Sequence, residues 1–416
     1  MKTENNDGVA PSRAVMVNTG KSEAVDRLRS VAPDTELDVI TERAYASMYA
    51  AGTRLHFVDD VGDLTVMRDT VLGLLARQPI DHVIAPSERS LLPGGYLRSV
   101  FGIPGIGFDT ANRFSNKAVM KAVLAAAGLP VARHHAVGDW RSVAQAAGEI
   151  GWPVVVKPAL GTGSMNVFSV KSAADWERLA ASPESDGLRR ARCPLLVERR
   201  IEMEAEYHCD GLVRNGEVVF AGVSRYLRTV LDTVGEFNGS VVLADDNPDV
   251  ARARELHREI VDTLGLRNGV THLELYRTTS GFVVGEISCR PAGGGIIEAV
   301  QLKHGVDLWR GFMEAELGRA PTPPVLVDPG NSDTVAVCRL PARPGRVVEV
   351  SSEEELSRLA GVERVTMKVR PGAVIGTRVH SASVSGLVYL RAKSEDLLLK
   401  YVDALLSGYV LEVEPE

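Results

Sequence analysis

Residues 271–295 read THLELYRTTSGFVVGEISCRPAGGG, two alternating arms rich in β-branched and aromatic residues around a glycine-containing turn. This pattern predicts a β-hairpin. With the turn centred in TTSG, Glu274 lies opposite Glu286. His272 then lies opposite Ser288, and all four side chains point to one face. Two facing carboxylates repel each other, so the hairpin indicates a cation held between them.

A magnesium site is the chemistry that this hairpin favours. Mg²⁺ takes one or two carboxylates and leaves its other positions to phosphate and water, which suits Glu274 and Glu286. Arg290 follows the second arm and supplies an anion-binding group. The glycines at 293–295 let the backbone approach a ligand closely. The alternative is a solvated hairpin face without a ligand.

The composition limits the classes of function. The chain has 416 residues, 45% hydrophobic and 24% charged, as in a globular protein of roughly two to four compact units. The net charge of -7 argues against sequence-independent nucleic-acid binding. No apolar run is long enough for a membrane span, and four scattered cysteines indicate neither structural zinc nor a disulfide framework. Residues 1–12 are polar and predict a disordered tail, so we expect a cytoplasmic protein.

The order of predicted elements suggests a mixture of α/β and α+β domains. Strands and helices alternate over residues 13–110, which predicts a Rossmann-like parallel sheet, although this region lacks the glycine motif of dinucleotide sites. Residues 111–325 form the predicted central unit, with a small lobe at about 130–200 and a large lobe at about 201–325. After a proline-rich stretch, residues 326–416 predict short strands and a final helix, interpreted as a C-terminal lid or dimerisation domain.

A nucleotide-phosphate site is predicted in the small lobe. Lys157 ends the apolar strand VVVK, where a lysine suits a buried anion such as a phosphate. The loop Gly161-Thr162-Gly163-Ser164 joins this strand to the next one, and its backbone N–H groups can cradle phosphates. An ordinary hairpin turn is the alternative for this loop.

The following strand suggests where the rest of the nucleotide would bind. Glu198 ends that strand, and the connection through Ile201 offers backbone groups to an adenine. Glu206 can accept hydrogen bonds from ribose hydroxyls. A surface carboxylate is the alternative for each acidic residue.

These segments occur in the order seen in ATP-grasp enzymes, which the chain resembles over about residues 10–410. The residues that carry the resemblance are Asn116, Lys117, Val154–Lys157 with the glycine-rich loop, Glu198, Glu206, Glu274 and Glu286–Arg290. The resemblance implies an ATP-grasp fold, with a two-lobed ATP-binding unit between the Rossmann-like domain and a small β-rich C-terminal domain.

The resemblance also implies roles for single residues. Lys117 and Lys157 would contact the phosphates of ATP. Glu198 with its neighbours would hold the adenine, and Glu206 the ribose. The two facing glutamates would hold Mg²⁺, for which Mn²⁺ can substitute. Ser288 departs from the family, which usually has Asn two residues after the second glutamate, so one of two metal ions would be held less tightly.

The segments THLE at 271–274 and RPAGG at 290–294 look most like the amino-acid ligase branch. In that branch a carboxylate and the γ-phosphate of ATP form an acyl phosphate, which an amine attacks, releasing ADP and phosphate. Arg290 would stabilise the acyl phosphate and the oxyanion. His272 would orient the acyl oxygen or the nucleophile, or else bond a neighbouring strand. Arg225 would bind a substrate carboxylate or the γ-phosphate, or else form a surface salt bridge.

Three other functions are alternatives at this point. They are a ligase that loads an amino acid onto a carrier-protein thiol, a purine-pathway or carboxylase-type ATP-grasp enzyme, and a non-catalytic nucleotide-binding module. The intact pair of glutamates favours catalysis, and no biotinyl-lysine segment is present. Expected partners are a small-molecule carboxylate and amine, a carrier protein if the acceptor is a thiol, and a second copy in a homodimer.

Overall fold

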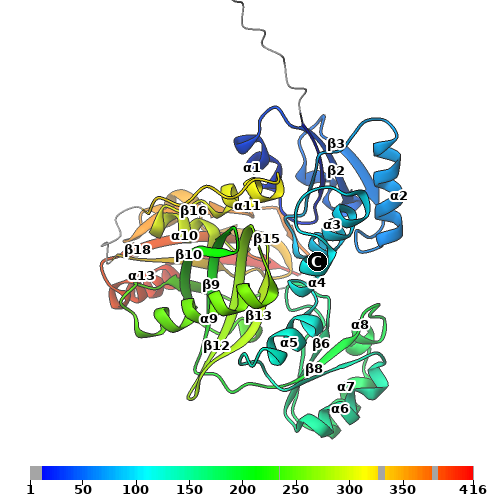
Figure 1. The fold of residues 1–416 in the computed structure, drawn as a ribbon. Coiled ribbons are helices and arrows are strands. Elements are labelled where there is room, and N and C mark those ends of the chain that lie inside the picture. The colour runs from blue at the N-terminus through cyan, green and yellow to red at the C-terminus, as the bar shows by residue number, and fades with distance from the viewer. Residues whose placement is uncertain (1–11, 234, 327–332, 377–382, 416) are drawn as a thin grey trace, which may run out of the picture. The chain divides into compact units, whose positions relative to one another are not determined.

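The computed structural model describes residues 12–233, 235–326, 333–376 and 383–415 (Figure 1). The predicted tail over residues 1–12 falls almost entirely outside this range. The chain divides into two compact units, Met1–Asn112 with Trp309–Thr322, and Arg113–Leu308 with Pro323–Glu416. In the part of the chain that is described, no helix combines the length and apolar character needed to cross a membrane.

The first unit contains a parallel sheet with the strand order β3-β2-β1-β4. Its strands are β1 (Arg13–Val17), β2 (Glu36–Glu42), β3 (Arg54–Val58) and β4 (His82–Ile84). Its helices are α1 (Ala24–Val31), η1 (Arg43–Met48), α2 (Leu64–Leu75), α3 (Glu88–Phe101) and most of α4 (Phe108–Arg113) and α11 (Leu308–Glu316). The Rossmann-like sheet predicted from the alternation of strands and helices is therefore confirmed.

A buried ion pair joins the two stretches of chain that form this unit. Arg98 Nη2 lies 2.5 Å from Glu316 Oε2, and both side chains are almost inaccessible. The same carboxylate oxygen accepts a hydrogen bond from the N–H of Ala85, directly after β4. The returning segment is therefore anchored at the carboxyl end of the sheet.

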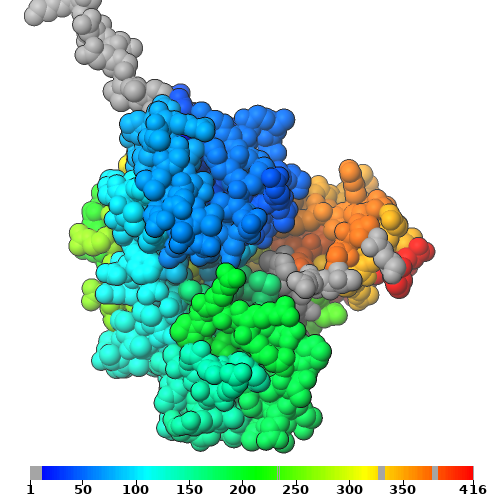
Figure 2. All heavy atoms as spheres, turned by 90° about the vertical axis from the view of Figure 1, so that its right-hand side faces the viewer, coloured from blue at the N-terminus to red at the C-terminus, as the bar shows by residue number. Residues whose placement is uncertain are grey.

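The small lobe of the second unit is an antiparallel sheet with the strand order β5-β8-β6-β7. Its strands are β5 (His134–Val137), β6 (Val154–Pro158), β7 (Phe168–Val170) and β8 (Leu195–Arg199). Its helices are η2 (Trp140–Ser142), α6 (Val143–Ile150), α7 (Ala173–Ala181), η3 (Pro183–Ser185) and α8 (Asp186–Arg189). Helices and sheet share one core that includes Val154, Val156 and Trp176. Figure 2 shows the teal and green outer surface of this lobe.

The large lobe is built on an antiparallel eight-stranded sheet with the order β13-β12-β9-β10-β11-β14-β18-β16. Its strands are β9 (Ala205–Arg214), β10 (Glu217–Tyr226), β11 (Asn238–Val242), β12 (Gly269–Thr278), β13 (Gly281–Ser288), β14 (Thr334–Leu340), β16 (Val362–Met367) and β18 (Gly386–Ala392). The accompanying helices are α5 (Lys117–Ala126), η4 (Leu231–Thr233), α9 (Pro248–Leu264), α10 (Ile296–His304) and α13 (Glu395–Gly408).

The C-terminal region shares this sheet, because β14, β16 and β18 continue it beyond β11. Val241 of β11 packs in one core with Val388 of β18 and Leu398 of α13. A separate three-stranded sheet is formed by β15 (Gly345–Val350), β17 (Val374–Ile375) and β19 (Leu411–Glu414), with α12 (Glu353–Ser357) nearby in sequence. The domain boundary expected near residue 325 remains a prediction; the sheet itself is continuous across that position.

Candidate active site

The hairpin of β12 and β13 has the register predicted from the sequence. Glu274 pairs with Glu286, and His272 pairs with Ser288. The strands meet in a tight turn, and Gly285 is an extra residue that bulges out of the pairing. A Cβ atom on Gly285 would lie 2.9 Å from the ring of Tyr276, so the bulge needs a glycine. The predicted face with two carboxylates, a histidine and a serine is therefore confirmed.

The same face continues onto β9, where paired residues lie side by side. Asp210 pairs with His272, and His208 pairs with Glu274. Because side chains alternate along a strand, Glu206 also lies on this face. The sheet therefore gathers polar side chains from three neighbouring strands on one surface.

Lys117 links the hairpin to the glycine-rich loop. Its Nζ lies 2.8 Å from Glu286 Oε1 and donates a hydrogen bond of 2.8 Å to the carbonyl oxygen of Gly161. The Asn116 side chain caps α5 by accepting from two backbone N–H groups, which fixes Lys117 at the first helical position. One cation thus contacts both a predicted metal ligand and the predicted phosphate loop.

The Glu198 carboxylate forms ion pairs with two buried lysines. Its Oε1 lies 2.5 Å from Lys157 Nζ, and its Oε2 lies 3.0 Å from Lys121 Nζ. Burial raises the pKa of Glu198, but the two ammonium groups outweigh it and lower the pKa to about 2. Both oxygens of this carboxylate therefore hold lysines in place. Any contact of this segment with adenine would come from the backbone. Sequence analysis missed Lys121, although a lysine on the apolar side of the helix pattern was a usable signal.

Asp210 is a second residue that sequence analysis missed. Its Oδ1 lies 2.8 Å from His272 Nδ1, and its Oδ2 lies 2.6 Å from His208 Nδ1. Burial lowers the pKa of His272, whereas Asp210 and Glu274 raise it more, to about 9. His272 therefore bonds a neighbouring strand, which was the alternative interpretation. Its Nε2 still faces Glu274 Oε1 at 3.7 Å, so it also adds positive charge beside the carboxylates.

Ser288 and Glu206 complete this part of the face. The Ser288 hydroxyl is buried and has no hydrogen-bond partner among the described residues. Its oxygen is therefore available as a ligand, two residues from Glu286 on the same strand. Glu206 Oε2 accepts a hydrogen bond of 2.8 Å from the N–H of Val230. The cluster His208, Asp210 and His272 also has metal-ligand spacing, but both oxygens of Asp210 are already bonded to imidazoles.

The glycine-rich loop connects β6 and β7, as predicted. Gly163 and Ser164 have φ angles of 61° and 59°, in the left-handed region. The N–H of Met165 donates to the carbonyl oxygen of Thr162 and closes a turn. A turn of this kind can point successive N–H groups to one side, and such concave backbone segments bind anions in other proteins.

The two predicted catalytic arginines have different surroundings. Arg290 lies two residues beyond Ser288, just after β13, and donates a hydrogen bond to the Pro291 carbonyl. Ser224 pairs with His208 and therefore lies on the same face as Glu274. Arg225 is the next residue along β10, so its side chain points to the opposite face of the sheet. There it forms an ion pair with Glu395 of α13. This ion pair and this orientation match the salt-bridge alternative for Arg225, and its catalytic role remains a prediction.

Known proteins are similar to the chain over nearly its whole length. An ATP-grasp domain model matches residues 150–298, and a model of L-amino acid ligase C-terminal domain 2 matches residues 339–414. The L-arginine-specific L-amino acid ligase of Bacillus subtilis is 34% identical over 407 residues, which are 96% of this chain and 98% of that protein. Dapdiamide A synthase of Enterobacter agglomerans is 24% identical over 321 residues, 74% of each chain.

Solved structures show the same fold. The crystal structure of an L-amino acid ligase from Bacillus licheniformis has a TM-score of 0.76 at 16% identity and covers 98% of this chain and 100% of that one. Carboxyaminoimidazole ribonucleotide synthase from Aspergillus clavatus, solved in complex with ATP, has a TM-score of 0.70 at 15% identity and covers 95% of this chain and 98% of that one.

Proposed function

The chain belongs to the L-amino acid ligase family of ATP-grasp enzymes, and we propose that it joins the carboxylate of one L-amino acid to the amine of a second amino acid. The observation that carries this proposal is the facing pair of Glu274 and Glu286, with Lys117 bridging Glu286 and the glycine-rich loop. Ligases of this family use ATP to activate the carboxylate as an acyl phosphate.

The donor set fits a magnesium ion. Two carboxylates lie opposite each other, and the buried hydroxyl of Ser288 lacks a hydrogen-bond partner among the described residues. Hard oxygen ligands of this kind suit Mg²⁺. Glu274, Glu286 and Ser288 would hold the ion, which would neutralise charge on the phosphates of ATP. Mn²⁺ would substitute because it accepts the same oxygen ligands.

The remaining residues would position ATP and the acyl group. Lys117 and Lys157 carry positive charge beside the glycine-rich loop and would contact phosphates, with Glu198 holding Lys157 in place. Arg290 would bind the acyl phosphate and the oxyanion that forms when the amine attacks. Glu206 would bind ribose, and the backbone from Glu198 to Ile201 would bind adenine.

The direct test is incubation with ATP, Mg²⁺ and pairs of L-amino acids, followed by phosphate release and mass spectrometry of the products. Amino acids are the proposed substrates. A carrier-protein acceptor and a homodimer remain predictions, which intact-protein mass spectrometry and the molar mass in solution would check.

We expect turnover to yield ADP and phosphate. The carboxylate attacks the γ-phosphorus, so the bond to the β-phosphate breaks and ADP leaves. Chromatography of the nucleotides after turnover checks this, with phosphate measured in the same sample. AMP in equal amount to the ligated product would contradict the acyl-phosphate mechanism.

Gly163→Val should raise KM for ATP and lower kcat. Gly163 has a φ of 61°, which a β-branched residue strongly disfavours, so the loop would lose the path that points N–H groups at phosphate. A displaced loop would also admit water, and more phosphate would be released per product formed.

The control for this variant is Gly128→Val, because Gly128 also has a positive φ, of 76°, but follows α5 outside the loop. Steady-state kinetics with both phosphate and product measured would separate the two variants. If Gly163→Val kept tight coupling and the wild-type KM for ATP, the loop would be an ordinary turn.

A further inference from the structure

Arg339 of β14 forms no ion pair within the described part of the chain. It is only partly exposed, yet its guanidinium forms no hydrogen bond or ion pair with any residue in the described ranges. It lies 5.5 Å from the centre of the Tyr226 ring. A guanidinium keeps its charge at all physiological pH values, and partial burial without an anion is unfavourable. This arrangement therefore favours an anionic ligand.

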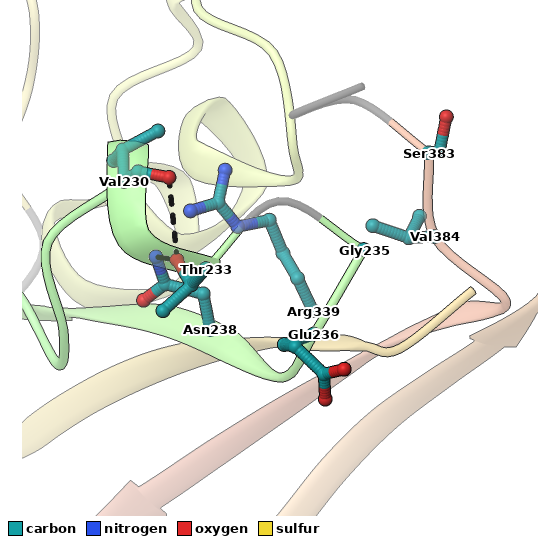
Figure 3. A pocket seen from close by; sticks show the side chains of 8 residues that line it. All are labelled: Val230, Thr233, Gly235, Glu236, Asn238, Arg339, Ser383 and Val384. Atoms are coloured by element: carbon teal, nitrogen blue, oxygen red, sulfur yellow. Dashed lines mark hydrogen bonds between the residues drawn. The ribbon is translucent and has the colours of Figure 1, made fainter. Parts of the chain in front are cut away.

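Arg339 lines a small cavity of about 10 Å³ at the end of β11 (Figure 3). Thr233 and Asn238 bond to each other on one side of the cavity, with Asn238 Nδ2 2.6 Å from Thr233 Oγ1. Figure 3 shows the carboxylate of Glu236 pointing away from the guanidinium, so this neighbour does not neutralise it. The volume is about that of one water molecule, so it would take one carboxylate oxygen, and the rest of a ligand would extend beyond it.

The cavity lies on the sheet face that carries the metal ligands. Arg339 pairs with Asn238, and two residues further along β11, Ser240 pairs with Tyr226. Ser224 pairs with His208, and Tyr226 is two residues further along β10, so both side chains lie on the same face as His208. The His208 and Tyr226 rings are 4.8 Å apart. The Arg339 side chain therefore lies on the same face as Glu274 and extends over the Tyr226 ring.

Arg339 and Glu274 lie apart on the same face. Arg339 is on β14 and Glu274 is on β12, four strands apart, which corresponds to about 19 Å between their backbones. The Arg339 side chain covers part of this distance, because it extends over Tyr226 of β10, two strands from Glu274. A ligase of two amino acids must also distinguish two α-carboxylates. The reacting one lies at the phosphate and metal, whereas the other stays free and needs a cation at some distance from them.

We propose that Arg339 binds the free α-carboxylate of the amino acid that supplies the amine. This inference rests on the proposed function of the site. Arg339 would make a charge-assisted, two-pronged hydrogen bond to that carboxylate and aim the amine at the acyl phosphate. Arg339 would thus select amino acids over other amines as acceptors.

The first test varies the substrate and leaves the protein intact. Each of the twenty L-amino acids is offered as acceptor in free form and as its α-amide, with ATP, Mg²⁺ and a fixed donor. The amine of an amide is less protonated at neutral pH, so intrinsic reactivity favours the amide. We expect the enzyme to prefer the free acid by about 10- to 100-fold in kcat/KM. Equal use of acid and amide would overturn the inference.

The second test varies Arg339. R339Q should raise KM for the free amino acid about 10- to 100-fold, leave the α-amide almost unaffected, and so remove the preference. R339K should restore part of it. R364Q is the matched control, because Arg364 also lies 5.5 Å from a tyrosine ring, that of Tyr389, and is exposed. Thermal midpoints of all variants show whether the fold is kept.

The outcomes separate the inference from the function on which it rests. If wild-type protein ligates amino acids but R339Q keeps the acid preference, only the inference fails. An equal rise in KM for acid and amide would assign Arg339 to structure and also overturn it. If the wild type neither hydrolyses ATP nor forms product with any pair, the proposed function fails and the inference fails with it.

Discussion

Glu286→Gln is expected to remove nearly all turnover and to leave the thermal midpoint close to that of the wild type. Glu286 faces Glu274 across the hairpin, so losing one charge relieves repulsion while it weakens binding of Mg²⁺. The variant also loses the ion pair with Lys117. These two changes in the free energy of unfolding have opposite signs, and the Glu286 side chain is 22% exposed, so the net change in stability should be small.

The measurement is product formation at saturating ATP and Mg²⁺, together with direct titration of Mn²⁺ into the protein with an ATP analogue. Glu259→Gln serves as the control, since Glu259 is a carboxylate on α9 paired with Arg252 at the surface. Turnover above roughly a tenth of the wild-type rate would argue against Glu286 as a metal ligand.

Glu198→Ala should destabilise the small lobe by about 3–5 kcal/mol. The carboxylate lies between Lys121 and Lys157, and both lysines are more than 90% buried. Its removal leaves two ammonium groups near each other without a counter-ion. The pKa of Glu198 is lowered to about 2, so its stabilisation is complete above the unfolded pKa and is lost only as the pH falls toward 2. The penalty should therefore be constant around neutral pH.

Urea unfolding followed by tryptophan fluorescence measures this effect, because Trp140, Trp152 and Trp176 all pack on the small-lobe core. Adding Lys121→Met to the variant should recover part of the loss, since it removes one of the uncompensated charges. Glu149→Ala, an exposed carboxylate on α6, is the control. If Glu198→Ala unfolded at the wild-type urea concentration, the two ion pairs would contribute little to the stability of this lobe.

The sequence by itself determined the hairpin and the polar residues that it carries. Strand alternation has a period of two and the turn is short, so the hairpin itself follows from residues close together in the chain. The bulge at Gly285 then brings Glu286 opposite Glu274, as the sequence prediction had it. The parallel sheet of the first unit and the loop between β6 and β7 were predictable for the same reason. Local pattern and turn chemistry carried each of these predictions.

Only the tertiary structure decided which distant residues meet. The contact of Asp210 with His208 is local to β9, but nothing near Asp210 in the sequence indicates that it also bonds His272, because that contact depends on β9 pairing with β12. Lys121 acquires its role from β8, and the strands after residue 333 join the large sheet through β11.

Arg225 and Arg339 illustrate the difference between what a local pattern predicts and what strand pairing decides. Arg225 and Arg339 are both single basic residues in apolar strands, and the sequence gives no reason to rank one above the other. Strand order and register place Arg225 on the face of α13, with Glu395, and Arg339 on the face of Glu274 and Glu286. Which side of a sheet becomes the catalytic side is set by pairings between strands far apart in the chain, and these depend on the packing of the whole unit rather than on any local pattern.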